Sequence, residues 1–149
     1  MNRITKLFQE KKDGINSIYF TAGYPELHNT QSVLEALQSN GIDIVEIGIP
    51  FSDPMADGPV IQDAATQSLR NGMSLKLLFE ELKDIRKTIE MPLVFMGYLN
   101  PIMQYGFEQF CLSCVEAGID GVIIPDLPFA DYLSDFKDIA DKNDVKMIM

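Results

Sequence analysis

Residues 44–50 read Ile44-Val45-Glu46-Ile47-Gly48-Ile49-Pro50, an apolar and mostly β-branched run with one acidic residue. β-Branched residues favour a strand, and the glycine and proline indicate where that strand ends. An ionised carboxylate is costly to bury in such a strand. Burial favours the protonated form of a carboxyl group, which lets such a group donate or accept a proton near neutral pH. Glu46 is therefore a candidate acid–base residue.

A loop with a second acidic candidate follows this strand. It reads Phe51-Ser52-Asp53-Pro54-Met55-Ala56-Asp57-Gly58-Pro59. Two carboxyl groups in different environments can divide acid and base roles, which makes Asp57 a possible partner of Glu46. The residues alone leave two alternatives open. Glu46 could pair with a buried cation, and Asp57 could be a turn residue, because Asp-Gly is a frequent turn.

The rest of the chain alternates between apolar strands and amphipathic helices. We predict further strands at 17–23, 92–98, 121–126 and 145–149, and helices at about 2–12, 30–39, 60–70, 75–89, 107–117 and 130–142. This alternation predicts an α/β fold with a parallel sheet covered by helices. It suits an open doubly wound sheet or a (βα)8 TIM barrel. No Gly-x-Gly-x-x-Gly follows the first strand, which disfavours a dinucleotide fold.

The length bears on which of these folds forms. A (βα)8 barrel usually needs about 250 residues, whereas the chain has 149 residues and ends within an apolar run. We therefore expect residues 1–149 to be a single domain, the N-terminal portion of a TIM barrel, here a truncated partial barrel with strands 1–5 of 8. Such a partial barrel would leave a sheet edge unpaired and an apolar face uncovered.

The composition excludes several classes of partner. The net charge is −10, from 22 acidic and 12 basic residues, which argues against binding to nucleic acid or to an anionic membrane surface. No run approaches the roughly 20 apolar residues of a membrane span, and the N-terminus lacks the apolar core of a signal peptide. Cys111 and Cys114 have redox-motif spacing but lie within a predicted helix, so ordinary thiols are favoured over a metal or redox site. We expect a cytoplasmic protein without a metal.

Four segments resemble the tryptophan synthase α subunit family. Residues 45–62 resemble the family signature, and residues 19–25, 96–102 and 121–128 resemble its first, third and fourth strands with the loops that follow. The resemblance is collinear over the whole chain. It implies a (βα)8 barrel and a carbon–carbon lyase of tryptophan biosynthesis that cleaves indole-3-glycerol phosphate to indole and glyceraldehyde 3-phosphate. It implies no cofactor in this subunit.

The resemblance also implies roles for individual residues. Glu46 would be the catalytic glutamate that moves a proton to the indole ring carbon, and Asp57 the second catalytic carboxylate, which interacts with the indole N–H. A flat aromatic substrate needs an apolar slot. The residues that match the family's substrate pocket or its mouth are Phe20, Ile61, Met96, Tyr98 and Ile123. Strand aromatics and methionines more often belong to a barrel core, so that alternative stays open for Phe20, Met96 and Ile123.

The resemblance implies a protein partner as well. Asp53, Asn100 and Pro128 match surfaces that the family presents to its β subunit, a pyridoxal-phosphate enzyme, in an α2β2 heterotetramer. The family's phosphate-binding loops lie in the last third of the barrel and match nothing in this chain, so we expect weak substrate binding without them. Two rival functions remain: another phosphate-binding TIM-barrel enzyme of amino-acid biosynthesis, and an inactive half-barrel that retains only protein association.

Overall fold

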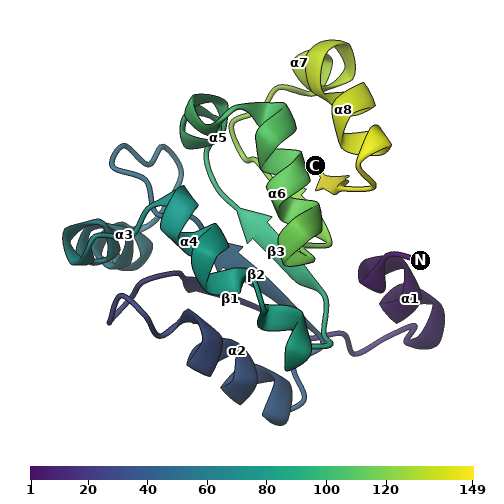
Figure 1. Cartoon of the computed structure of the whole chain (residues 1–149), viewed down its shortest axis with the longest axis horizontal. Coiled ribbons are helices and arrows are strands. Elements are labelled where there is room, and N and C mark those ends of the chain that lie inside the picture. The colour runs from purple at the N-terminus through teal and green to yellow at the C-terminus, as the bar shows by residue number, and fades with distance from the viewer.

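The computed structural model describes residues 1–149 and contains one five-stranded parallel sheet. The strands follow one another in chain order across the sheet (Figure 1). They are β1 (Ser17–Thr21), β2 (Ile44–Gly48), β3 (Leu93–Met96), β4 (Gly121–Ile123) and β5 (Lys146–Ile148). All five strands fall within the ranges predicted from the sequence, and none extends beyond its range.

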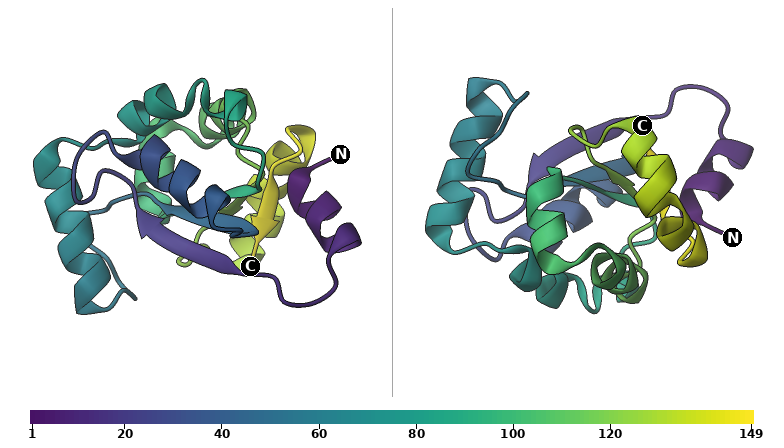
Figure 2. Two further views of the ribbon diagram at one scale, coloured as in Figure 1. Left: turned by 90° about the horizontal axis from the view of Figure 1, so that it is seen from below. Right: turned by 90° about the horizontal axis from the view of Figure 1, so that it is seen from above.

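The helices alternate with the strands, as the sequence predicts. The main ones are α1 (Arg3–Glu10), α2 (Thr30–Ser39), α3 (Pro59–Asn71), α4 (Leu75–Leu82), α5 (Leu99–Tyr105), α6 (Phe107–Ala117) and α8 (Lys137–Lys142). The short turns are η1 (Ile85–Lys87), α7 (Phe129–Asp131) and the π-helical η2 (Tyr132–Phe136). Figure 1 shows α2, α4 and α6 side by side in front of the strands. Figure 2 shows the strands on the side of the molecule away from these helices.

The two faces of the sheet differ because successive side chains in a strand point to opposite sides. On β2, Val45 and Ile47 are fully buried under the helices, whereas Glu46 lies on the other face and is half-buried. The same division extends to the neighbouring strands, because residues paired in register face the same side of the sheet. Tyr19 pairs with Glu46, and Gly48 pairs with Met96. The hydrophobic core therefore lies between sheet and helices, and the face with Glu46 has no helix layer over it.

Two helices depart from the sequence prediction. The helix predicted at 75–89 begins at its predicted cap, where Ser74 Oγ accepts a hydrogen bond from Leu77 N at 3.2 Å, but it ends at Leu82. The chain then turns through η1, which brings Arg86 to the amino end of β4. The last helix is likewise divided into α7, η2 and α8. Helix α5 was not predicted.

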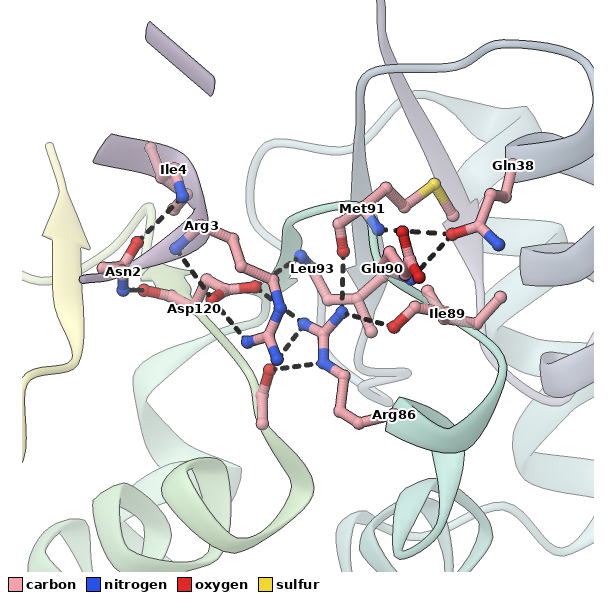
Figure 3. A network of polar contacts seen from close by, with 11 residues as sticks. Asn2, Arg3, Ile4, Gln38, Arg86, Ile89, Glu90, Met91, Leu93 and Asp120 are labelled. Atoms are coloured by element: carbon pink, nitrogen blue, oxygen red, sulfur yellow. Dashed lines mark hydrogen bonds and ion pairs between the residues drawn. The ribbon is translucent and has the colours of Figure 1, made fainter. Parts of the chain in front are cut away.

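A buried ion pair ties the amino ends of the elements together (Figure 3). Asp120 is 3% exposed and accepts hydrogen bonds from Arg86 Nη2 at 2.7 Å and from Leu93 N at 3.0 Å. Its other oxygen is 3.2 Å from Arg3 Nη1 of α1. Arg86 also donates to the carbonyl of Gly118, and burial lowers the pKa of Arg86 to about 10. The pair therefore joins α1, η1, β3 and β4.

Asp120→Ala is expected to destabilise the chain strongly, by about 3–5 kcal/mol, because it leaves the buried charge of Arg86 without its partner. Urea unfolding measures this change. Asp84→Ala is the matched control, because Asp84 forms an exposed pair with Lys87, and its removal should have a far smaller effect. Equal unfolding free energies for the Asp120 variant and the original chain would contradict a stabilising role for this pair.

Candidate active site

A small cavity lies beyond the carboxyl ends of the first four strands. Its volume is about 20 Å³, which is room for about one water molecule. It is lined by Tyr19, Ile49, Asp57, Met96, Gly97, Tyr98 and Pro125. Three of these residues, Asp57, Met96 and Tyr98, were predicted as site residues from the sequence. The structure therefore brings part of the predicted site together at one end of the sheet.

Asp57 is held in place by a tyrosine from the neighbouring strand end. Tyr98 Oη donates to Asp57 Oδ2 at 3.2 Å and accepts a hydrogen bond from Ala56 N at 2.9 Å. The tyrosine is 6% exposed, and its ring centroid lies 5.6 Å from that of Phe51. On the other side of the loop, Gln62 Nε2 donates to Asp57 O at 2.7 Å. The loop thus presents a carboxylate whose orientation is fixed by a buried phenol.

Glu46 lies on the open face of β2, and its environment differs from the enclosed one that the sequence predicts. The residue is half-buried, because no helix covers this side of the sheet. Ser17 Oγ donates a hydrogen bond to Glu46 Oε1 at 2.7 Å. No cation forms an ion pair with Glu46, so the structure does not support the alternative of a buried pair. Glu46 does not line the small cavity.

Tyr19 lies between the two carboxylates, and sequence reasoning did not select it. It is the register partner of Glu46 and lines the cavity together with Asp57. Burial raises the pKa of Tyr19, and the nearby charges of Asp57, Tyr98 and Glu46 raise it further. The phenol lies against Gly48, where any Cβ would overlap the hydroxyl. A glycine is required at that position because the tyrosine ring occupies the space above it.

Phe20 does not join this group. It pairs with Ile47, so it lies on the face of β1 that carries the helices and packs against the core there. Since side chains alternate along a strand, Phe20 and Tyr19 cannot face the same side. The structure therefore places Phe20 on the face of the sheet opposite Glu46, whereas Tyr19 shares the face of Glu46.

Two of the remaining predicted pocket residues lie on the face of the sheet that carries Glu46. Met96 and Ile123 are register partners on adjacent strands and are both half-buried. Ile61 belongs to the first turn of α3 and is also half-buried, one turn before the buried Ala64 and Ala65. Met96 and Ile123 supply apolar surface on the face of Glu46, and Met96 also lines the cavity with Asp57.

The three residues predicted to meet a partner are all exposed, and each follows the carboxyl end of a strand. Asp53 follows β2, Asn100 is in the first turn of α5 after β3, and Pro128 precedes α7 after β4. Large apolar side chains are also exposed in these segments. They are Met55, Val60, Met103 and Phe129.

The cysteines are remote from this site. Cys111 and Cys114 are free and buried in α6, and burial raises the pKa of Cys111 to about 11 and that of Cys114 well above its ordinary value. Such thiols are poor nucleophiles. No group of three or more His, Cys, Asp or Glu side chains is placed to hold a metal ion. None of the helices has the length and apolar character needed to cross a membrane.

Comparison with protein families gives one match that covers almost the whole chain. Residues 5–149 match the family described as tryptophan synthase alpha chain. A tryptophan synthase alpha chain from Parabacteroides distasonis is 71% identical over 149 residues, which are all of this chain and 58% of that protein. One from Phocaeicola vulgatus is 64% identical over the same span. The chain thus spans about 58% of the length of these curated relatives.

Solved structures give the same result for the fold. The chain superposes on tryptophan synthase subunit alpha from Legionella pneumophila with a TM-score of 0.93 at 40% identity, over 99% of this chain and 57% of the other. It superposes on a chain of the tryptophan synthase complex from Pyrococcus furiosus with a TM-score of 0.84 at 37% identity, over 91% of this chain and 55% of the other. These similarities confirm that the five strands form part of a TIM-barrel fold.

Proposed function

The chain belongs to the tryptophan synthase alpha chain family, and from this premise we propose that it takes part in the retro-aldol cleavage of indole-3-glycerol phosphate to indole and glyceraldehyde 3-phosphate. The chain spans about 58% of its relatives' length, so the proposal concerns the activity of a complete barrel. Within it, residues 1–149 serve as a single N-terminal portion.

One observation carries the proposal: Glu46 on the open face of β2 and Asp57 in the loop that follows both lie near the phenol of Tyr19. Cleavage of the bond to the indole ring requires a proton on the ring carbon and stabilisation of positive charge on the ring. Glu46 is the proposed proton donor and acceptor. Asp57, fixed by Tyr98, is the proposed partner of the indole N–H, where a negative charge stabilises the developing positive charge.

The proposed pocket around these groups is apolar. Met96 and Ile123 lie on the same side of the sheet as Glu46, and Tyr19 takes the first-strand position. Ile61 adds apolar surface from α3. Such walls suit the flat indole ring, whereas the phosphate needs groups that would come from the rest of the barrel.

We also propose that the exposed strand-end segments bind a β subunit. A similar chain occurs in a structure described as the tryptophan synthase complex from Pyrococcus furiosus. The segments with Asp53, Asn100 and Pro128 combine exposed polar residues with large apolar side chains such as Phe129, which is 60% exposed. Interfaces are commonly built from apolar anchors within a polar rim.

A second candidate function is protein association without catalysis. The observation that favours it is the open sheet, because β1 and β5 are both edge strands and carry exposed apolar residues, Ile18 at 39% and Ile148 at 37%. Unpaired edges of this kind promote pairing with another chain.

An assay for indole release from indole-3-glycerol phosphate tests the proposal. Two proteins are compared: this chain alone, and a chimera in which it replaces the matching 149 residues of the Parabacteroides distasonis relative. We expect catalysis by the chimera and little by the chain alone, because only the chimera has a complete barrel. Failure of a folded chimera to release indole would contradict the proposed function. Indole release would also exclude another phosphate-handling barrel activity as the main function.

A further inference from the structure

The carboxylate of Glu46 is bound by a residue that does not lie directly opposite it. The register places Tyr19 opposite Glu46 and Ser17 opposite Ile44. Ser17 is therefore two positions nearer the amino end, a displacement of about 6.6 Å along the strand. Because Ser17 Oγ donates to Glu46 Oε1 at 2.7 Å, the carboxylate is turned toward the amino end of the sheet.

Asp57 lies in the opposite direction, beyond the carboxyl ends of the strands. The cavity at that end is lined by Asp57, Tyr98 and Tyr19, and Glu46 has no part in it. The Tyr19 phenol lies over Gly48, two residues closer to the carboxyl end than Glu46. The ring of Tyr19 therefore stands between the carboxylate of Glu46 and the cavity of Asp57.

We propose that Ser17 is a positioning residue that holds Glu46 in a withdrawn orientation, separated from the Asp57 cavity by the Tyr19 ring. The inference rests on the proposed function, in which both carboxylates act on one bound indole ring. The cavity of about 20 Å³ beside Asp57 holds at most the edge of that ring, and Glu46 does not line it. Glu46 must then leave Ser17 before it can reach the substrate.

Loss of the serine hydroxyl should therefore increase activity. In a complete barrel, Ser17→Ala removes the bond that stabilises the withdrawn orientation and leaves the reacting arrangement unchanged. We expect kcat/KM for indole release to rise about fivefold, which corresponds to about 1 kcal/mol for one exposed hydrogen bond.

The activity test compares four variants of the chimera. Ser17→Val and Ser17→Thr have side chains of similar shape, with a methyl group in valine where threonine has a hydroxyl, and both residues are suited to a strand. We expect Ser17→Ala and Ser17→Val to exceed Ser17→Thr in kcat/KM. Ser39→Ala is the matched control, because Ser39 Oγ donates to Glu35 O on the outside of α2. It should leave kcat/KM unchanged. An unchanged or lower kcat/KM for both Ser17→Ala and Ser17→Val would overturn the proposal.

A second measurement needs no activity. The side-chain carboxyl signal of Glu46 can be assigned by carbon-13 NMR from its loss in Glu46→Gln. We expect that signal to shift in Ser17→Ala and Ser17→Val, and to stay in place in Ser17→Thr and Ser39→Ala. An unchanged signal in Ser17→Ala and Ser17→Val would contradict the hydrogen bond between Ser17 and Glu46. If the chimera releases indole and Ser17 has no influence, the positioning role alone fails. If the signal shifts while the chimera releases no indole, the proposed function fails and the contact stands.

Discussion

Glu46→Gln in the chimera is expected to lower kcat for indole release by at least about 100-fold, since a positioned acid–base group contributes 10²–10⁴-fold. The amide has nearly the shape of the carboxyl group and retains an oxygen that can accept the hydrogen bond from Ser17. It cannot donate and accept a proton in the same way. Steady-state kinetics measure the rate, and urea unfolding should give a free energy close to that of the unchanged protein.

Glu80→Gln is the matched control for this substitution. Glu80 is exposed on α4, on the helix side of the sheet, and should tolerate the same chemical change without loss of rate. A turnover of Glu46→Gln near that of the control would remove Glu46 from the mechanism. A low rate accompanied by a large fall in unfolding free energy would instead indicate a structural carboxylate.

The strands and their order follow from local signals in the sequence. Val45 and Ile47 flank Glu46 within a short apolar run that ends at Gly48, and this pattern predicts both the strand and the acid within it. The face on which each residue lies is harder to predict. In the segment around Phe20, apolar residues follow one another without alternation, so the pattern does not indicate which of them face the same side as Glu46. The strand register places Tyr19 beside Glu46.

Contacts between distant residues explain the elements that were missed. Helix α5 begins where Asp126 Oδ1 accepts a hydrogen bond from Leu99 N at 2.8 Å, a cap supplied by the loop after the next strand. Helix α4 ends early, and the turn that follows places Arg86 against Asp120 across 34 residues. Asp126 and Asp120 are too far along the sequence from these helices for a local helical pattern to predict either contact. The Ser17–Glu46 hydrogen bond is likewise invisible until the two strands are paired.

Asp57→Asn in the chimera is expected to lower kcat for indole release by about 100-fold, the scale of removing one preorganised electrostatic contact. Asparagine can keep the oxygen that accepts from Tyr98 Oη, so the loop should retain its conformation. What it loses is the negative charge proposed to stabilise the indole cation. Asp63→Asn, on an exposed position of α3, is the matched control and should keep the original rate.

The same substitution has an effect that does not depend on catalysis. The charge of Asp57 is one of the causes that raise the pKa of Tyr19, so Asp57→Asn should lower that pKa, whereas Asp63→Asn should not. Ultraviolet titration of tyrosinate in the 149-residue chain itself can detect this change, because that chain has five tyrosines and no tryptophan. Tyr19→Phe identifies the signal. A lower Tyr19 pKa with an unaltered rate would place Asp57 beside Tyr19 but return it to the role of a turn residue. A lower pKa together with a lost rate would make its charge, held by Tyr98, part of the reaction.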